Sequence, residues 1–164
     1  YVGRTFIEPT QNIRSLGVKL KLSSTKSIVK NKSIILIDDS LVRGTTCHKI
    51  VKMLYESGAK EVHVRIACPE IKYPDFYGVD MPTKNELLAH EKTNEEMCKY
   101  INAKSLKFLS LSGLYEGLEK GKRNSSYPQF SDHYFTGDYP VKPSDNLGEL
   151  KITQLSLLSG KSNN

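Results

Sequence analysis

The sequence predicts an α/β fold in which a parallel sheet is flanked by helices and followed by an irregular C-terminal arm. The chain has 164 residues, 38% of them hydrophobic and 26% charged, which is the balance of one globular domain. Short apolar runs rich in β-branched residues alternate with segments whose apolar residues recur at helical spacing. This alternation is typical of parallel sheets joined by crossover helices.

The first two strands and the helix between them are the clearest elements. Residues 33–37 form a continuous apolar run, which predicts a strand buried on both faces of the sheet. Residues 45–57 carry apolar side chains on one helical face, and Gly58 is suited to follow the helix C-terminus. Residues 61–67 predict a second strand, which the crossover places parallel to the first.

Capping signals define the later elements. The capping boxes TKNE and TNEE predict helices over residues 83–88 and 93–102. Residues 106–109 predict a third strand, and residues 112–120 a helix capped by Ser112. We therefore expect the sheet and its helices to end at residue 121.

Residues 122–164 lose this periodicity. Asn124 is followed by two serines, and prolines stand at positions 128, 140 and 143, so we expect an irregular arm.

Charge and composition narrow the class of partner. The net charge of +6 attracts phosphates of any kind, whether of a nucleic acid or of a small substrate. Aromatic residues are not interleaved with the basic residues near the N-terminus, which disfavours a surface for single-stranded nucleic acid. No run of eighteen apolar residues and no signal peptide is present, so we expect a cytoplasmic protein without membrane contact. The three cysteines form no C-x-x-C pair and are predicted to be reduced.

The turn that follows the first strand suits a phosphorylated sugar. Asp38 and Asp39 can accept hydrogen bonds from a vicinal diol and hold Mg²⁺. Gly44 lets the backbone approach a ligand, and Thr45 and Thr46 bring hydroxyls and amides to a helix N-terminus that attracts anions. A diol at one end and a phosphate at the other describe ribose 5-phosphate.

Each half of this pattern also has a simpler interpretation. An acidic pair after a strand occurs in receiver-type aspartate pockets, and two threonines at a helix start can serve only as a cap.

The motifs resemble those of one enzyme family. Residues 34–46 resemble the phosphoribosyl pyrophosphate signature of type I phosphoribosyltransferases, whose fold is a parallel sheet flanked by helices. Residues 1–22 are similar to the mobile loop of the glutamine phosphoribosylpyrophosphate amidotransferases. Further similar motifs lie at residues 69–71, 77–82, 86–89, 135–137 and 139–140.

The resemblance implies a reaction and a set of roles. In it, ammonia displaces pyrophosphate from the ribose and forms 5-phosphoribosylamine, which opens purine biosynthesis. Asp38 and Asp39 would hold the ribose hydroxyls and Mg²⁺, and loop residues 1–27 would close over the pyrophosphate. The residues implied for the 5-phosphate are Arg43, Gly44, Thr45 and Thr46, and Ser40 is implied as a further substrate-binding residue. Those implied for the closing loop are Arg4, Arg14 and Lys19.

The resemblance also implies a cluster-free enzyme. Cysteines of the family's iron–sulfur branch occupy the positions of Asp75, Ser131 and Tyr134, and none of these is cysteine here. Ser23 and Thr10 also differ from the residues that are usual at these positions in the family. These two differences affect the details expected for closure of the loop.

By this resemblance the chain is a C-terminal portion that lacks the glutaminase domain and is incomplete alone. The expected partners are phosphoribosyl pyrophosphate, the missing N-terminal portion and further copies of the chain. The alternative is a non-catalytic regulator that senses phosphoribosyl pyrophosphate and binds nucleic acid. That alternative does not account for the motifs at residues 1–22 and 77–82.

Overall fold

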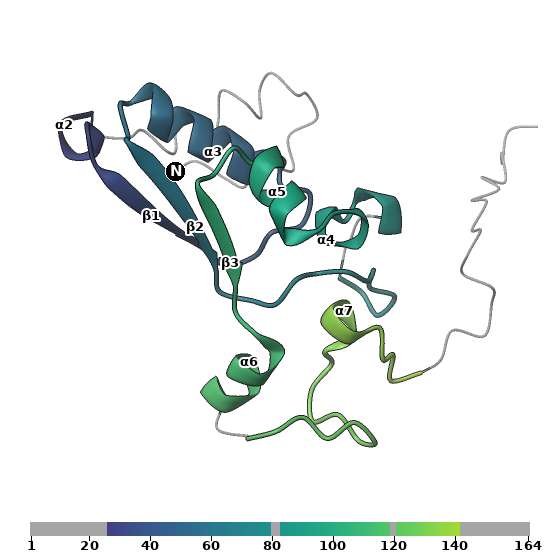
Figure 1. Cartoon of the computed structure of the whole chain (residues 1–164). Helices are drawn as coiled ribbons and strands as arrows, with labels where there is room; N and C mark the ends of the chain where they lie inside the picture. Colours follow the sequence, from purple (N-terminus) through teal and green to yellow (C-terminus); the bar gives the residue numbers. More distant parts are fainter. Residues whose placement is uncertain (1–25, 80–82, 119–120, 142–164) are drawn as a thin grey trace, which may run out of the picture.

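The computed structural model describes residues 26–79, 83–118 and 121–141 (Figure 1). Three parallel strands form one sheet in the order β1-β2-β3, with Leu36 of β1 opposite Val64 of β2. The strands are β1 (Ser33–Asp38), β2 (Glu61–Ile66) and β3 (Ser105–Phe108). The α/β fold and the parallel sheet are thus confirmed.

Short helices connect and extend the sheet. Helix α3 links β1 to β2, whereas α4 and α5 precede β3. The helices are α2 (Lys26–Val29), α3 (Thr45–Glu56), the 3-10 turn η2 (Lys84–Glu86), α4 (Leu88–Glu91), α5 (Asn94–Tyr100), α6 (Leu111–Gly117) and α7 (His133–Thr136). None of these helices in the described residues is long and apolar enough to cross a membrane.

The core lies between one face of the sheet and the helices α3, α4 and α5. Val62 and Val64 of β2 are fully buried there, together with Val51 of α3 and Ile101 after α5. The opposite face is open in the described part of the chain. Its β1 residues Ile35 and Ile37 are 65% and 72% exposed, so the predicted burial of this strand on both faces is wrong for these residues.

Two sequence signals gave correct helix ends. Thr93 accepts a hydrogen bond from the Glu96 amide while the Glu96 side chain accepts one from the Thr93 amide, which is the predicted capping box. Gly58 follows α3 with a φ of 93°, a conformation that glycine adopts readily.

Two other predicted caps were wrong. Residues 84–86 form only a 3-10 turn, because Leu87 is extended and separates that turn from α4. The cap of α6 is Ser110, whose side chain accepts a hydrogen bond from the Gly113 amide at 3.0 Å, and not Ser112. The helix therefore starts sooner after β3 than the sequence predicted.

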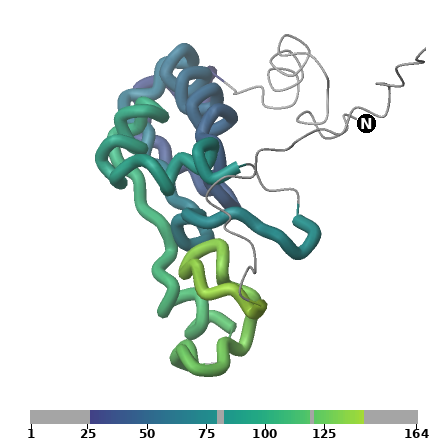
Figure 2. Tube along the Cα trace, turned by 90° about the vertical axis from the view of Figure 1, so that its right-hand side faces the viewer, coloured from purple at the N-terminus to yellow at the C-terminus, as the bar shows by residue number. Residues whose placement is uncertain are grey.

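The described part of the C-terminal arm, residues 122–141, packs against the segment that follows β2. Figures 1 and 2 both place the arm beyond the carboxyl edge of the sheet. The carbonyl of Tyr134 accepts hydrogen bonds from the amides of Lys72 and Tyr73, at 2.9 and 3.1 Å. The arm also contains α7, which the sequence pattern did not predict.

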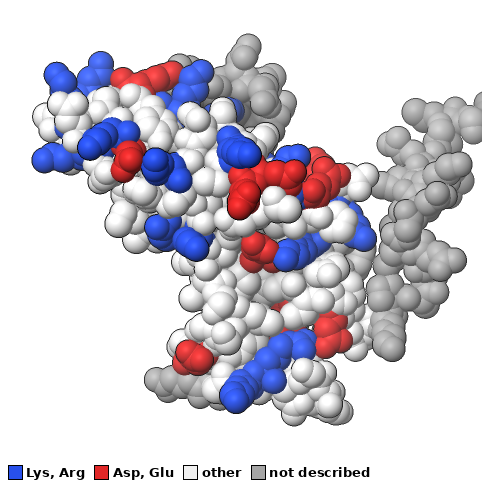
Figure 3. All heavy atoms as spheres, in the orientation of Figure 1, with Lys and Arg blue, Asp and Glu red and all other residues white. Residues whose placement is uncertain are grey.

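Lysine side chains gather at the opposite end of the sheet. Lys32, Lys60 and Lys104 each precede a strand and are exposed. Figure 3 shows basic side chains around this α2 end of the molecule. Because parallel strands all start there, this positive charge lies away from the turn that follows β1.

Candidate functional site

The acidic pair stands where β1 leaves the sheet. The Asp38 carbonyl accepts a hydrogen bond from the Ala67 amide at 2.9 Å, which joins it to β2. Its carboxylate accepts one from the Asp39 amide at 3.1 Å, and the Asp39 carboxylate accepts one from the Ser40 amide at 2.7 Å. The two side chains therefore fold against the backbone of the turn.

The electrostatics of this pair favour a cation. Partial burial raises the pKa of Asp38; the Asp39 amide opposes this rise, and the negative charge of Asp39 adds to it. Two carboxylates so close together repel each other in their charged forms. A bound cation would relieve that repulsion.

Gly44 makes the turn into α3 possible. Its φ is 74°, a left-handed conformation that residues with a Cβ adopt at a cost. A Cβ placed there would also lie 2.6 Å from Leu88 Cδ2 and 3.0 Å from Tyr100 Cε1. The turn therefore combines an unusual backbone with a tight packing contact.

The start of α3 presents backbone amides. No side chain from the described residues caps this helix, and Thr45 and Thr46 of its first turn are exposed. Amides of a first helical turn lack partners within the helix and attract anions. This end of the site can hold a phosphate.

Arg43 points toward the segment that precedes α4. Its Nε donates to Glu86 Oε1 at 3.3 Å, and the two side chains are 54% and 49% exposed. This bond lowers the pKa of Glu86. Glu86 is a residue of the site's surroundings that the sequence pattern did not single out.

Two thiols behind the acidic pair are unsuited to nucleophilic chemistry. Burial, with the nearby charge of Asp38, raises the pKa of Cys47 to about 12. Burial, with the charge of Asp39, raises the pKa of Cys68 to about 11. Both cysteines are free and remain protonated at neutral pH.

A cleft of about 430 Å³ opens at the same edge of the sheet, beyond β2 and β3. Phe108, Leu109 and Phe135 form apolar walls, and Lys72 and Ser110 contribute polar groups. Ligands of parallel α/β sheets bind beyond the carboxyl ends of the strands, where both the cleft and the turn after β1 lie.

The structure brings most predicted site residues together. Seven of them lie between the last residue of β1 and the first turn of α3: Asp38, Asp39, Ser40, Arg43, Gly44, Thr45 and Thr46. The three residues predicted to close over the pyrophosphate, Arg4, Arg14 and Lys19, lie outside the described residues.

The positions that match the cluster cysteines lie where the arm meets the segment after β2. Asp75 accepts a hydrogen bond from His133 Nε2 at 2.7 Å, and these two side chains are 0% and 1% exposed. The Tyr134 ring lies beside His133, with ring centroids 4.0 Å apart, and burial with the charge of Asp75 raises its pKa. Oxygen and nitrogen groups thus occupy this region of the described chain.

Known proteins match nearly the whole chain. An amidophosphoribosyltransferase of Rhizobium etli is 54% identical over 160 residues, which is 97% of the chain and 32% of that relative. Amidophosphoribosyltransferase 2, chloroplastic, of Arabidopsis thaliana is 50% identical over 89% of the chain and 25% of its own length. The chain therefore spans about a third or less of these relatives. No protein-family model matches it.

Solved structures give the same result. Glutamine phosphoribosylpyrophosphate amidotransferase from B. subtilis, complexed with ADP and GMP, superposes with a TM-score of 0.70 and is 46% identical. The match covers 85% of this chain and 30% of that one. A structure described as the allosteric regulatory enzyme of purine biosynthesis gives a TM-score of 0.66 at 45% identity.

The sheet, the acidic pair and the glycine turn into α3 define part of a type I phosphoribosyltransferase domain. The names of the relatives narrow this class to one group of enzymes. The chain is homologous to part of the amidophosphoribosyltransferases.

Proposed function

We propose that this chain supplies the ribose 5-phosphate site of an amidophosphoribosyltransferase, which forms 5-phosphoribosylamine from phosphoribosyl pyrophosphate and glutamine-derived ammonia. The observation that carries the proposal is the turn that places Asp38 and Asp39 at one end and the first amides of α3 at the other. The names of the relatives support the particular reaction. The turn itself supports the binding of the ribose 5-phosphate end of the substrate.

The proposed roles follow the chemistry of the turn. Asp38 and Asp39 accept hydrogen bonds from the ribose hydroxyls and orient the ring. The backbone of Gly44 and the amides and hydroxyls of Thr45 and Thr46 hold the 5-phosphate at the start of α3. We propose that Ser40 and Arg43 complete this end, and that Arg4, Arg14 and Lys19 exclude water above the pyrophosphate.

The acidic pair fits Mg²⁺. Carboxylate oxygens are the donors that this cation prefers, and the raised pKa of Asp38 reflects a position that a positive charge would stabilise. When bound, Mg²⁺ would stabilise the negative charge of the departing pyrophosphate.

We also propose that no iron–sulfur cluster is bound. Asp75, Ser131 and Tyr134 offer no thiolate, and Asp75 already pairs with His133. Anaerobically purified protein should be colourless, and stoichiometric iron with acid-labile sulfide would contradict this part of the proposal.

The activity of the whole enzyme requires more than this chain. We propose that a preceding portion supplies glutamine hydrolysis, that the assembled enzyme is a homo-oligomer and that it works in the cytoplasm. The coverage of the relatives, which are about three times longer, supports the first of these statements. Glutamine-dependent turnover by this chain alone would contradict it.

Titration of phosphoribosyl pyrophosphate in the presence of Mg²⁺ tests the site. Asp38→Asn and Asp39→Asn each remove a charge-assisted acceptor, worth about 1.5–3 kcal/mol, so the affinity should fall about tenfold or more. Glu116→Gln, on the exposed surface of α6, is the matched control and should bind like the wild type. Unchanged affinity in both Asn variants would reject the assignment.

A further inference from the structure

Residues 83–88, which we call the buttress, contact the turn after β1 at three points. Glu86 accepts the hydrogen bond from Arg43, and the Leu88 amide donates to the Val42 carbonyl at 2.9 Å. The side chain of Leu88 also lies against Gly44. Every residue from 42 to 44 therefore has a partner on the buttress.

Glu86 is itself held in place. Its Oε2 accepts a hydrogen bond from Thr83 Oγ1 at 3.3 Å, and its amide donates to the Thr83 carbonyl at 2.9 Å. One carboxylate oxygen thus faces Thr83 and the other faces Arg43. Hydrogen bonding to Arg43, with its charge, lowers the pKa of Glu86, so the pair is ionic at neutral pH.

The bond to Glu86 uses only one edge of the guanidinium. It involves Arg43 Nε, and among the described residues no hydrogen bond or ion pair is formed by the two terminal nitrogens. A guanidinium has five N–H donors in a planar fork, which suits two-point binding of a phosphate. The contact can therefore fix the direction of Arg43 and leave donors for an anion.

We propose that Glu86 is a positioning residue, which acts through Arg43 to set the affinity of the turn for the 5-phosphate. The inference rests on the proposed function, because it takes the turn to be a phosphate site. Without Glu86 the exposed arginine would sample more directions before it met the ligand. Exposed ion pairs have small effects, so the expected change in affinity is about two- to fivefold.

A double-mutant cycle with ribose 5-phosphate as the probe tests this coupling. We expect Glu86→Gln to weaken binding about two- to fivefold in the wild-type chain. It should have no further effect in an Arg43→Ala chain, because a residue that acts through Arg43 has nothing left to position. Glu91→Gln, a nearby exposed carboxylate on α4, is the matched control and should leave the affinity unchanged.

Each other outcome has a distinct meaning. Tighter binding by Glu86→Gln would show that Glu86 competes with the phosphate, which overturns the proposal. An equal loss in both backgrounds would show a general structural role, and a parallel drop in melting temperature would identify it. Failure of the wild-type chain to bind ribose 5-phosphate would reject the proposed function and this inference with it.

Discussion

At the scale of single residues, Gly44 is constrained twice, by its positive φ and by its contact with Leu88. The two constraints differ in strength. Leu88 Cδ2 is the end of a flexible side chain and can shift, whereas the backbone conformation cannot change without moving the amides of α3. The conformation is therefore the stronger reason for glycine.

We predict that Gly44→Ala lowers the free energy of unfolding by about 1–2 kcal/mol, the cost of a left-handed residue with a Cβ. It should also weaken ribose 5-phosphate binding, since the turn must adjust. Thermal unfolding and ligand titration measure the two effects. Gly117→Ala is the control, because an added Cβ there meets no atom within 4 Å and its φ is not positive. Equal stability of both variants would contradict the argument.

Residue patterns predicted some local features well and others poorly. Thr93 and Thr83 begin the same type of sequence motif, but only Thr93 caps a helix. The difference lies at Leu87, which is fully buried and extended. Its burial is a tertiary effect that the local sequence does not encode, and the same holds for the bond between Arg43 and Glu86, 43 positions apart.

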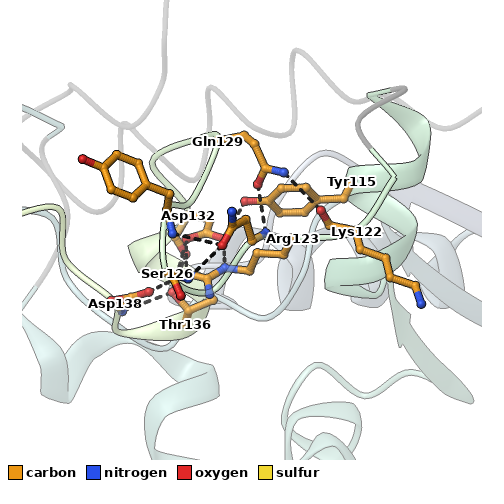
Figure 4. Close-up of polar contacts among 10 residues, drawn as sticks. Tyr115, Lys122, Arg123, Ser126, Gln129, Asp132, Thr136 and Asp138 are labelled. Atoms are coloured by element: carbon orange, nitrogen blue, oxygen red, sulfur yellow. Dashed lines mark hydrogen bonds and ion pairs between the residues drawn. The ribbon is translucent and has the colours of Figure 1, made fainter.

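At the scale of elements, the C-terminal arm is held together by Arg123. Its guanidinium donates to both carboxylate oxygens of Asp132 and to Asp138, and Asp132 also accepts a bond from Tyr115 of α6 (Figure 4). Asp132 is buried, so its charge depends on these partners. The network connects α6 to both sides of α7.

Removal of Arg123 should release the arm. In Arg123→Met the buried carboxylate of Asp132 loses its cation, and losses of about 3–5 kcal/mol are typical for such a change. Hydrogen exchange should then become faster at the amides of Lys72 and Tyr73, which bond to Tyr134 of the arm. The amides of β2 serve as the internal control and should stay protected. Uniformly unchanged exchange would show that Arg123 does not hold the arm.

Acidic pH should weaken the contacts that hold the C-terminal arm. Burial acts to raise the pKa of Asp75, but hydrogen bonds from Val79 and His133 lower this pKa below the ordinary 3.8. Burial also acts to raise the pKa of Asp132, but the hydrogen bonds from Arg123 lower it below 3.8. Carboxylates with depressed pKa values stabilise the fold fully above their unfolded pKa, and that contribution is lost as the pH falls through and below it.

We therefore predict that the arm's protection declines below about pH 4. Hydrogen exchange at several pH values, corrected for intrinsic rates, measures this decline. Asp132→Asn should be less stable at neutral pH and show a flatter acid response. A wild-type arm whose protection does not decline below about pH 4 would contradict the prediction.

The strands β1 and β2 and the helix α3 were largely predictable from the sequence, whereas the contacts of the C-terminal arm were not. The apolar runs at β1 and β2 and the helical face of α3 are local periodicities. The bond between Asp75 and His133 joins residues 58 positions apart, and no periodicity reports on it. The short helix α7 exists within these long-range contacts, which explains why it was missed.

At the scale of the whole molecule, the sheet has one covered and one open face in the described residues. Ile35 and Ile37 lie on the open face beside the polar group of His63, Arg65 and Ser105. An apolar strip of this kind favours association. We expect the isolated chain to associate with itself through this strip.

Substitution of this strip should change association without unfolding the chain. The double variant Ile35→Thr, Ile37→Thr should reduce self-association of the isolated chain, measured by analytical ultracentrifugation, and leave its melting temperature nearly unchanged. The matched variant Ile34→Thr, Leu36→Thr affects the face that packs on the core and should lower the melting temperature. Equal effects of the two pairs would show that both faces are packed.

The strand order β1-β2-β3 also has a consequence for synthesis. Each strand pairs with its predecessor in the chain, so the sheet can grow in the order in which it leaves the ribosome. The arm closes onto residues 72 and 73 only after some sixty more residues have been made, as the bonds to Tyr134 require. Docking of the arm therefore follows the pairing of the strands. Chains that end at residue 118 and have been released from the ribosome should already hold a paired sheet, while the loop after β2 remains open to proteases.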